Sequence, residues 1–177
     1  MRYIAFLRAI NVGGHVVKMD RLRKLFEGEG FTNVETFIAS GNVIFDGSGR
    51  TDTLERGIEK MLKVALGYEV STFVRTGAEL RAVAAHEPFS AAALDRAVAF
   101  NVAFLSKAPD AKGKKALLAL KTRDDEFDVH GRELYWLSRI RQGESVLSNA
   151  LFEKTLGQRS TMRGISTVRK MAEKYGT

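Results

Sequence analysis

The spacing of apolar residues changes several times along the first half of the chain, and each change predicts a new element. Residues 2–8 form an apolar run that is typical of a buried strand. Four apolar residues then recur at helical spacing: Met19, Leu22, Leu25 and Phe26. Residues 34–39 and 43–45 read as the two strands of a hairpin, a helix is expected over residues 53–66, and a strand over residues 70–74. The resulting order is β-α-β-β-α-β.

The second half repeats this order less clearly. The pattern predicts a strand at 97–105, a helix at 111–120, a hairpin of strands at 126–130 and 133–138, and a helix at 148–156. No final strand stands out, and the chain closes with an expected helix over residues 166–175.

Two consecutive βαββαβ patterns predict an α+β protein made of two ferredoxin-like subdomains. The second subdomain is expected to be degenerate and to carry the C-terminal helix. We place the first subdomain at residues 1–76, a connecting helix and a proline-containing joint at 77–92, and the second subdomain at 93–177.

The composition is that of an ordinary folded protein, with 177 residues of which 45% are hydrophobic and 28% charged. The absence of cysteine excludes disulfides, thiolate metal sites and cysteine nucleophiles. No apolar run approaches the ~20 residues of a membrane span, and the N-terminus lacks the order of a signal peptide. We therefore expect a cytoplasmic protein without a membrane partner.

The net charge of +7 is unevenly distributed along the sequence. Residues 1–89 hold 12 Lys and Arg against 11 Asp and Glu, whereas residues 90–177 hold 16 against 10. Such an excess attracts polyanions or phosphorylated ligands. A solvated basic face without a ligand explains it equally well.

A strand that ends in a glycine turn and leads into a helix can present backbone N–H groups to an anion. The segment Asn11-Val-Gly-Gly-His15 has this form, and a second polar turn lies in the hairpin. The candidate anion contacts of these two loops are Arg8, Asn11, Gly13, Gly14, Lys18, Ser40, Gly41 and Asn42. The alternative is that the glycines and asparagines only shape turns that need a positive φ.

A third candidate segment, residues 160–169, gathers hydroxyls and guanidinium groups around a helix start. Arginine can grip an oxyanion with two hydrogen bonds, and free helix N–H groups add to the field. Thr161, Arg163 and Thr167 are the anion contacts expected here. The alternative is an ordinary hydroxyl cap on the last helix with solvated arginines.

Several of these motifs, taken in order, resemble those of the bacterial domain-of-unknown-function 1697 family. They are Ala5-Phe-Leu-Arg8-Ala-Ile-Asn11-Val-Gly13-Gly14, Met19-x-x-Leu22-x-x-Leu25-Phe26, Gly30-Phe31-x-Asn33-Val34, Ser40-Gly41-Asn42-Val43-x-Phe45 and Thr161-x-Arg163-x-x-x-Thr167-Val168-x-Lys170. The resemblance covers essentially the whole chain. It implies a pair of ferredoxin-like subdomains and no established activity. The chain departs from the family at Gly164, where asparagine is common, and at Val146, where lysine often follows the serine.

The remaining polar residues predict little chemistry. The histidines at 15, 86 and 130 lack metal-ligand spacing, so no metal site is expected. Asp128 and His130 lie two apart on a strand and form either an acid–base dyad or a surface polar pair. The acidic run at 124–128 reads as a solvated loop.

Tyr135 and Trp136 occupy neighbouring strand positions, so one is expected to pack inward while the other is free to stack on a base. The aromatic signature of RNA-binding plaits is absent.

We therefore predict binding of an anionic ligand, either nucleic acid or a phosphorylated small molecule. The alternatives are a small-molecule enzyme acting in a cleft between the subdomains and a protein–protein interaction module. No nucleophile–base pair is visible, and the sequence decides neither whether the protein is an enzyme nor its reaction, cofactor or oligomeric state.

Overall fold

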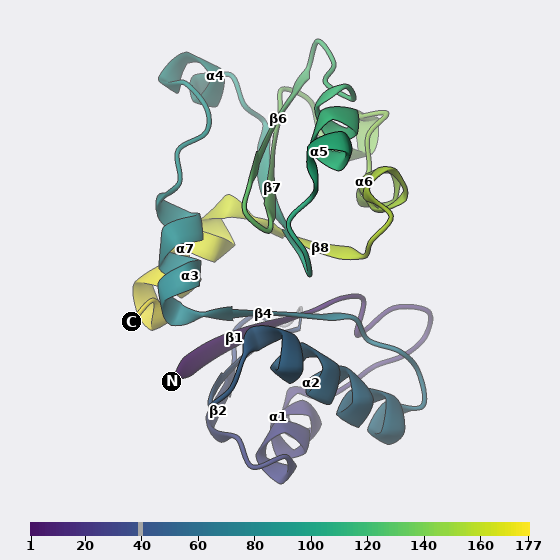
Figure 1. The fold of residues 1–177 in the computed structure, drawn as a ribbon, viewed down its shortest axis with the longest axis vertical. Helices are drawn as coiled ribbons and strands as arrows, with labels where there is room; N and C mark the ends of the chain where they lie inside the picture. The colour runs from purple at the N-terminus through teal and green to yellow at the C-terminus, as the bar shows by residue number, and fades with distance from the viewer. Residues whose placement is uncertain (39–40) are drawn as a thin grey trace. The chain divides into compact units, whose positions relative to one another are not determined.

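The computed structural model describes residues 1–38 and 41–177 and divides into two compact units. The N-terminal unit comprises residues 1–82 together with 170–177, and the C-terminal unit comprises residues 83–169. Each unit carries one four-stranded antiparallel sheet with helices packed against it (Figure 1). The predicted fold class, α+β with two ferredoxin-like subdomains, is confirmed.

The N-terminal unit follows the predicted element order. Its elements are β1 (Arg2–Leu7), α1 (Met19–Gly28), β2 (Thr32–Thr36), β3 (Asn42–Asp46), α2 (Thr51–Leu66), β4 (Thr72–Thr76) and the beginning of α3 (Gly77–Ala85). The strands lie in the order β2-β3-β1-β4. Both central strands are therefore flanked on each side, and β2 and β4 form the edges.

Alternation along β1 explains the core of this unit. Tyr3, Ala5 and Leu7 point to one face of the sheet, because successive side chains in a strand point in opposite directions. Helices α1 and α2 cover that face and contribute Phe26 and Leu62 to the same cluster (Figure 1). The hydrophobic spacing that predicted the elements thus also selects the buried face.

The C-terminal unit has the same strand permutation, β6-β7-β5-β8. Its elements are α4 (Ala91–Asp95), β5 (Ala99–Leu105), α5 (Ala111–Leu118), β6 (Asp125–His130), β7 (Glu133–Ser138), a 3-10 turn (Gln142–Glu144), α6 (Asn149–Leu156), β8 (Ser160–Gly164) and the start of α7 (Ile165–Tyr175). The core on its helix-covered face includes Trp136 and Phe152.

Strand β8 is the element that the sequence pattern did not reveal. Its residues are Ser-Thr-Met-Arg-Gly, and only Met162 packs against the apolar core. Ser160 and Thr161 are buried although they are polar. A strand with so few apolar residues shows no alternation of apolar and polar positions in the sequence. Its pairing with β5 completes the second plait.

The prediction that Tyr135 or Trp136 is free to stack on a base is wrong, because both side chains are buried. The indole Nε1 of Trp136 donates to Asp125, and the Tyr135 hydroxyl donates to the carbonyl of Val83. Within the part of the chain that the structure describes, no helix has the length and hydrophobicity to cross a membrane.

Candidate functional site

Strand β8 carries a partly buried arginine, Arg163, two residues before the start of α7. Strand β8 runs antiparallel to β5, with Thr161 opposite Phe104 and Arg163 opposite Val102. Thr161 and Arg163 are two residues apart, so their side chains share the face of the strand opposite to Met162. This alternation separates the polar face of β8 from the apolar core.

Hydrogen bonds hold the guanidinium of Arg163 close to its own strand. Its Nη1 atom lies 2.8 Å from the hydroxyl oxygen of Thr161 and 2.9 Å from the carbonyl oxygen of Met162. Burial lowers the pKa of Arg163 to about 10, because desolvation disfavours the charged form. The group still carries its proton at neutral pH. It is therefore a partly desolvated positive charge.

Helix α7 begins at Ile165, directly after β8 ends. The half-buried Thr167 lies in its first turn. The segment 160–169 contains two arginines and no acidic residue. The first-turn N–H groups of a helix carry a partial positive charge, so this junction combines a helix dipole with a guanidinium and hydroxyls.

The loop after β1 is shaped by its own side chain and by glycines. The Oδ1 atom of Asn11 accepts a hydrogen bond from the backbone N–H of Val17 at 2.8 Å, which closes the loop ahead of α1. Gly13 and Gly14 have φ values of 68° and 83°, in the left-handed region that favours glycine. Lys18 is the exposed N-cap residue of α1.

The turn before β3 lies beside that loop. Gly41 packs so closely that a Cβ atom would lie 3.0 Å from Ile10 Cγ2 and 3.2 Å from Leu7 Cβ. The buried Asn42 donates from Nδ2 to the Phe37 carbonyl at 3.0 Å. The two polar turns of the N-terminal unit are therefore neighbours. Ser40 lies outside the described residues.

Arg8 is half-buried just after β1, and its backbone N–H donates to the Ser71 carbonyl at 2.9 Å. The candidate contacts thus fall into two groups. Thr161, Arg163 and Thr167 belong to the C-terminal unit, and the other described candidates belong to the N-terminal unit.

A cluster that sequence reasoning missed lies in the C-terminal unit around His86. Its Nε2 atom lies 2.8 Å from Asp128 Oδ2, and its ring stacks on that of His130 at 4.3 Å between centroids. The Tyr135 ring is tilted against it at 4.8 Å. Asp128 thus pairs with His86, a residue 42 positions away. A sequence contains no signal for a pair at that separation.

The interpretation of residues 124–128 as a solvated loop is wrong for Asp125, which is buried at the start of β6. Its carboxylate accepts hydrogen bonds from Trp136 Nε1 at 2.8 Å and from Thr122 Oγ1 at 2.6 Å. The Ser145 hydroxyl lies 3.3 Å away. No group of three residues suited to hold a metal ion occurs among the described residues.

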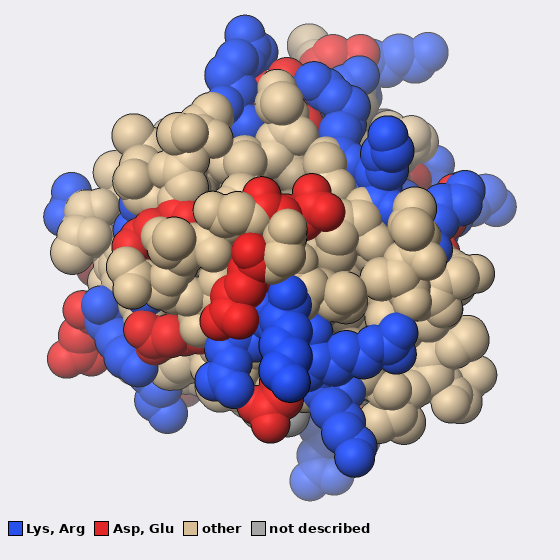
Figure 2. Space-filling view, turned by 90° about the horizontal axis from the view of Figure 1, so that it is seen from below, with Lys and Arg blue, Asp and Glu red and all other residues tan. Residues whose placement is uncertain are grey.

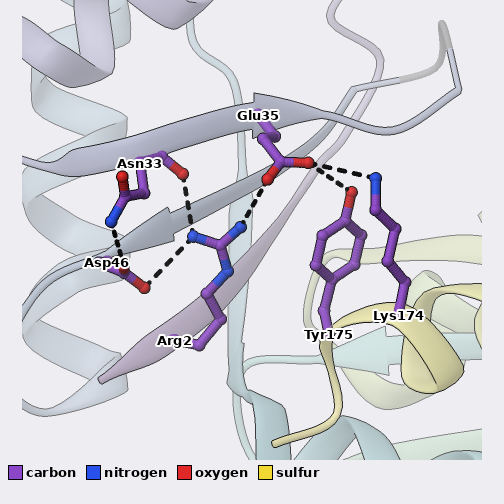
Figure 3. Close-up of polar contacts among 6 residues, drawn as sticks. All are labelled: Arg2, Asn33, Glu35, Asp46, Lys174 and Tyr175. Atoms are coloured by element: carbon purple, nitrogen blue, oxygen red, sulfur yellow. Dashed lines mark hydrogen bonds and ion pairs between the residues drawn. The ribbon is translucent and has the colours of Figure 1, made fainter.

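A polar cluster in the N-terminal unit joins the end of α7 to β1, β2 and β3 (Figure 3). Glu35 accepts hydrogen bonds from Arg2 Nη2 and the Tyr175 hydroxyl, both at 2.9 Å. Lys174 Nζ lies 3.3 Å from the same carboxylate. The hydrogen bond from Tyr175 is the main reason that the pKa of Glu35 is lowered. Arg2 also pairs with Asp46 at 3.3 Å, so the cluster is a network of mutually satisfied charges.

The charge imbalance between the sequence halves nearly disappears between the folded units. The N-terminal unit has 14 Lys and Arg against 11 Asp and Glu, and the C-terminal unit has 14 against 10. The net charges are +3 and +4. On the face drawn in Figure 2, acidic and basic side chains lie next to one another.

Two plaits with the same strand permutation define a duplicated α+β protein of the ferredoxin-like class. The model of the family "protein of unknown function (DUF1697)" matches residues 1–135, and the chain belongs to this family.

The chain is also similar to a solved structure, the conserved bacterial protein SP0830 from Streptococcus pneumoniae. The two are 22% identical, the alignment covers 97% of each chain, and the TM-score is 0.72. At this identity the likeness shows the shared fold. A search of curated proteins finds no significant match.

Proposed function

We propose that the protein binds a small anionic ligand, a phosphorylated or carboxylated molecule, at the junction of β8 and α7. The observation that carries this proposal is the largely desolvated guanidinium of Arg163 on β8, the strand that leads directly into an eleven-residue helix. A charge with little hydration interacts more strongly with an oxyanion than an exposed one does. Charge-assisted hydrogen bonds from a guanidinium are also among the stronger ones.

Each residue of the junction has a distinct role in this proposal. Arg163 supplies the charge, and the Thr161 hydroxyl orients the guanidinium through the 2.8 Å contact with Nη1. The hydroxyl of Thr167 and the first-turn N–H groups of α7 complete the donor set. Segment 160–169 itself contains no acidic residue.

Two observations favour a small ligand over nucleic acid. Nucleic-acid binding requires a broad basic surface. The net charges of the two units are only +3 and +4, and on the face drawn in Figure 2 acidic and basic side chains lie next to one another. Tyr135 and Trp136 are buried, so neither offers an aromatic platform for a base.

The turns of the N-terminal unit form the second part of the proposal. Close packing of Gly41 against Leu7 and Ile10 keeps the two turns together, which supports a joint role. The anion contacts proposed for them are Arg8, Asn11, Gly13, Gly14, Lys18, Ser40, Gly41 and Asn42. On the absence of cysteine we also propose a cytoplasmic location.

A second candidate function, proton transfer in an enzyme, is favoured by the pair of His86 and Asp128. A carboxylate bound to one ring nitrogen fixes the orientation of the imidazole. His86 is half-buried, so a ligand can reach its ring edge. An activity lost in both His86→Gln and Asp128→Asn, but retained in His15→Gln, would support this role.

A thermal-shift screen tests the main proposal. Phosphorylated metabolites, nucleotides and short DNA and RNA are added at low and at high salt. We expect one class of small anion to raise the melting temperature at both salt concentrations. A rise that only oligonucleotides produce and that salt abolishes would indicate a nucleic-acid surface instead. If no compound changes the melting temperature, both anion hypotheses fail and the interaction module remains.

A further inference from the structure

Strand β4 forms one edge of the N-terminal sheet, yet its outward N–H groups are all engaged by carboxylates. The N–H of Thr72 donates to Glu59 Oε1 at 2.9 Å, and the N–H of Val74 donates to Glu55 Oε1 at 2.9 Å. The N–H of Thr76 donates to a third glutamate, Glu79, at 2.8 Å. An edge strand normally leaves such groups to solvent or to a neighbouring strand.

The geometry of a helix beside a strand explains why two of these bonds form together. Glu55 and Glu59 are four residues apart on α2, which places them about 6 Å apart along the helix axis. Val74 and Thr72 are two residues apart on β4, about 7 Å along the strand. The spacings match, so one face of α2 carries acceptors in register with alternate N–H groups of the strand.

The third bond belongs to the turn from β4 into α3. The N–H of Glu79 donates in return to the Thr76 hydroxyl at 3.1 Å. This reciprocal pair is a capping box, in which threonine and glutamate satisfy each other's backbone N–H groups. It fixes the end of β4 and the start of α3 at the same time.

The side chain of Arg75 donates a hydrogen bond to a backbone carbonyl of β4. Nη1 of the buried Arg75 donates to the Val74 carbonyl at 2.9 Å and lies 3.8 Å from Glu55 Oε1. At Val74 both the backbone donor and the backbone acceptor are therefore met by side chains. Glu55 is itself buried.

We propose that Glu55, Glu59 and Glu79 replace a fifth strand and close the β4 edge against pairing with a second copy of this chain. Open edges are where sheets extend between molecules. Three carboxylates on alternate N–H groups occupy the donors that such pairing would need.

The first test uses the wild-type protein and measures amide hydrogen exchange by NMR. We expect the outward amides of Thr72 and Val74 to exchange as slowly as the inward amides of Phe73 and Arg75. Exchange at the rate of an unprotected edge would overturn the proposal, and this result needs no variant that folds.

The second test compares two double variants, Glu55→Ala with Glu59→Ala and Glu55→Gln with Glu59→Gln. Glutamine keeps an acceptor oxygen, so only the alanine pair is expected to speed exchange at Thr72 and Val74, by roughly tenfold or more. Only the alanine pair is expected to self-associate above the wild-type level in sedimentation velocity. Glu69→Ala, which removes an exposed carboxylate paired with Lys63, is the matched control.

The outcomes separate the parts of the proposal. Faster exchange without added association would overturn the barrier to pairing. Association of the glutamine pair to the same extent as the alanine pair would also overturn it. Unchanged exchange in the alanine pair would show that these carboxylates do not protect the edge.

Discussion

Single polar side chains complete the hydrogen bonding of this protein at its turns and strand ends. Asn11 closes the loop after β1, and Asn42 closes the hairpin before β3. Asp125 fixes the indole of Trp136 in the C-terminal core. Leaving a buried polar group without a partner costs about 1–3 kcal/mol, so the buried side chains of Asn42 and Asp125 are required by their surroundings.

Replacing Asp125 tests this view in the C-terminal unit. Asp125→Ala removes the acceptor of the Trp136 N–H and of the Thr122 hydroxyl, and we expect a loss of about 2–4 kcal/mol in the free energy of unfolding. Urea denaturation followed by the fluorescence of Trp136, the single tryptophan, measures the change. The half-exposed Asp124 provides the control. An equal loss in Asp124→Ala would show that the effect is not due to the buried network.

The cluster around Glu35 predicts a pH dependence. Its pKa lies below the ordinary value of 4.5, chiefly because Tyr175 donates a hydrogen bond to the ionised form. A lowered pKa in the folded state stabilises the protein above the unfolded pKa, and this contribution is lost as the pH falls through the folded pKa. The stability difference between wild type and Glu35→Gln is therefore expected to be present at neutral pH and to shrink as the pH falls below the ordinary value of 4.5. Urea unfolding at neutral pH and across the acidic range measures it, and a difference that grows on acidification would contradict the assignment.

At the scale of elements, hydrophobic periodicity predicted the helices and strands with strong apolar patterns. Helix α2 and strand β5 were found within a few residues of their bounds because one side of each packs on an apolar core. Strand β8 was missed because its buried residues include Ser160 and Thr161. Its position depends on backbone pairing with β5, which a one-dimensional pattern does not contain.

A glycine inside α2 and the glycine that caps its C-terminus predict opposite effects of the same substitution. A Cβ atom on Gly57, inside the helix, would meet nothing within 4 Å. Gly57→Ala is therefore expected to stabilise the protein by about 0.5–1 kcal/mol. Gly67 ends the helix at φ 83°, where alanine is strained, so Gly67→Ala is expected to cost about 1 kcal/mol. Thermal unfolding of both variants measures the changes, and destabilisation by Gly57→Ala would show that another molecule or segment needs the space.

At the scale of the whole chain, the sequence predicted the family and the duplicated fold. The positive charge that it attributed to the C-terminal half is divided nearly equally between the folded units. The excess counted over residues 90–177 includes Lys170 and Lys174, which the structure assigns to the N-terminal unit. The pairing of His86 with Asp128 was also hidden, because it depends on how the segment after α3 returns to β6. The burial of Arg163 is likewise a property of packing and not of composition.

The central claim, that Arg163 and the start of α7 bind an oxyanion, is tested most directly by an NMR titration with inorganic phosphate. We expect saturable shifts of the Arg163 Nε–H signal and of the backbone amides of residues 166–168. These shifts should disappear in Arg163→Gln and persist in Arg159→Gln, which removes an exposed guanidinium. Circular dichroism establishes that both variants are folded. Shifts confined to exposed lysines, or shifts that remain in folded Arg163→Gln, would contradict the claim.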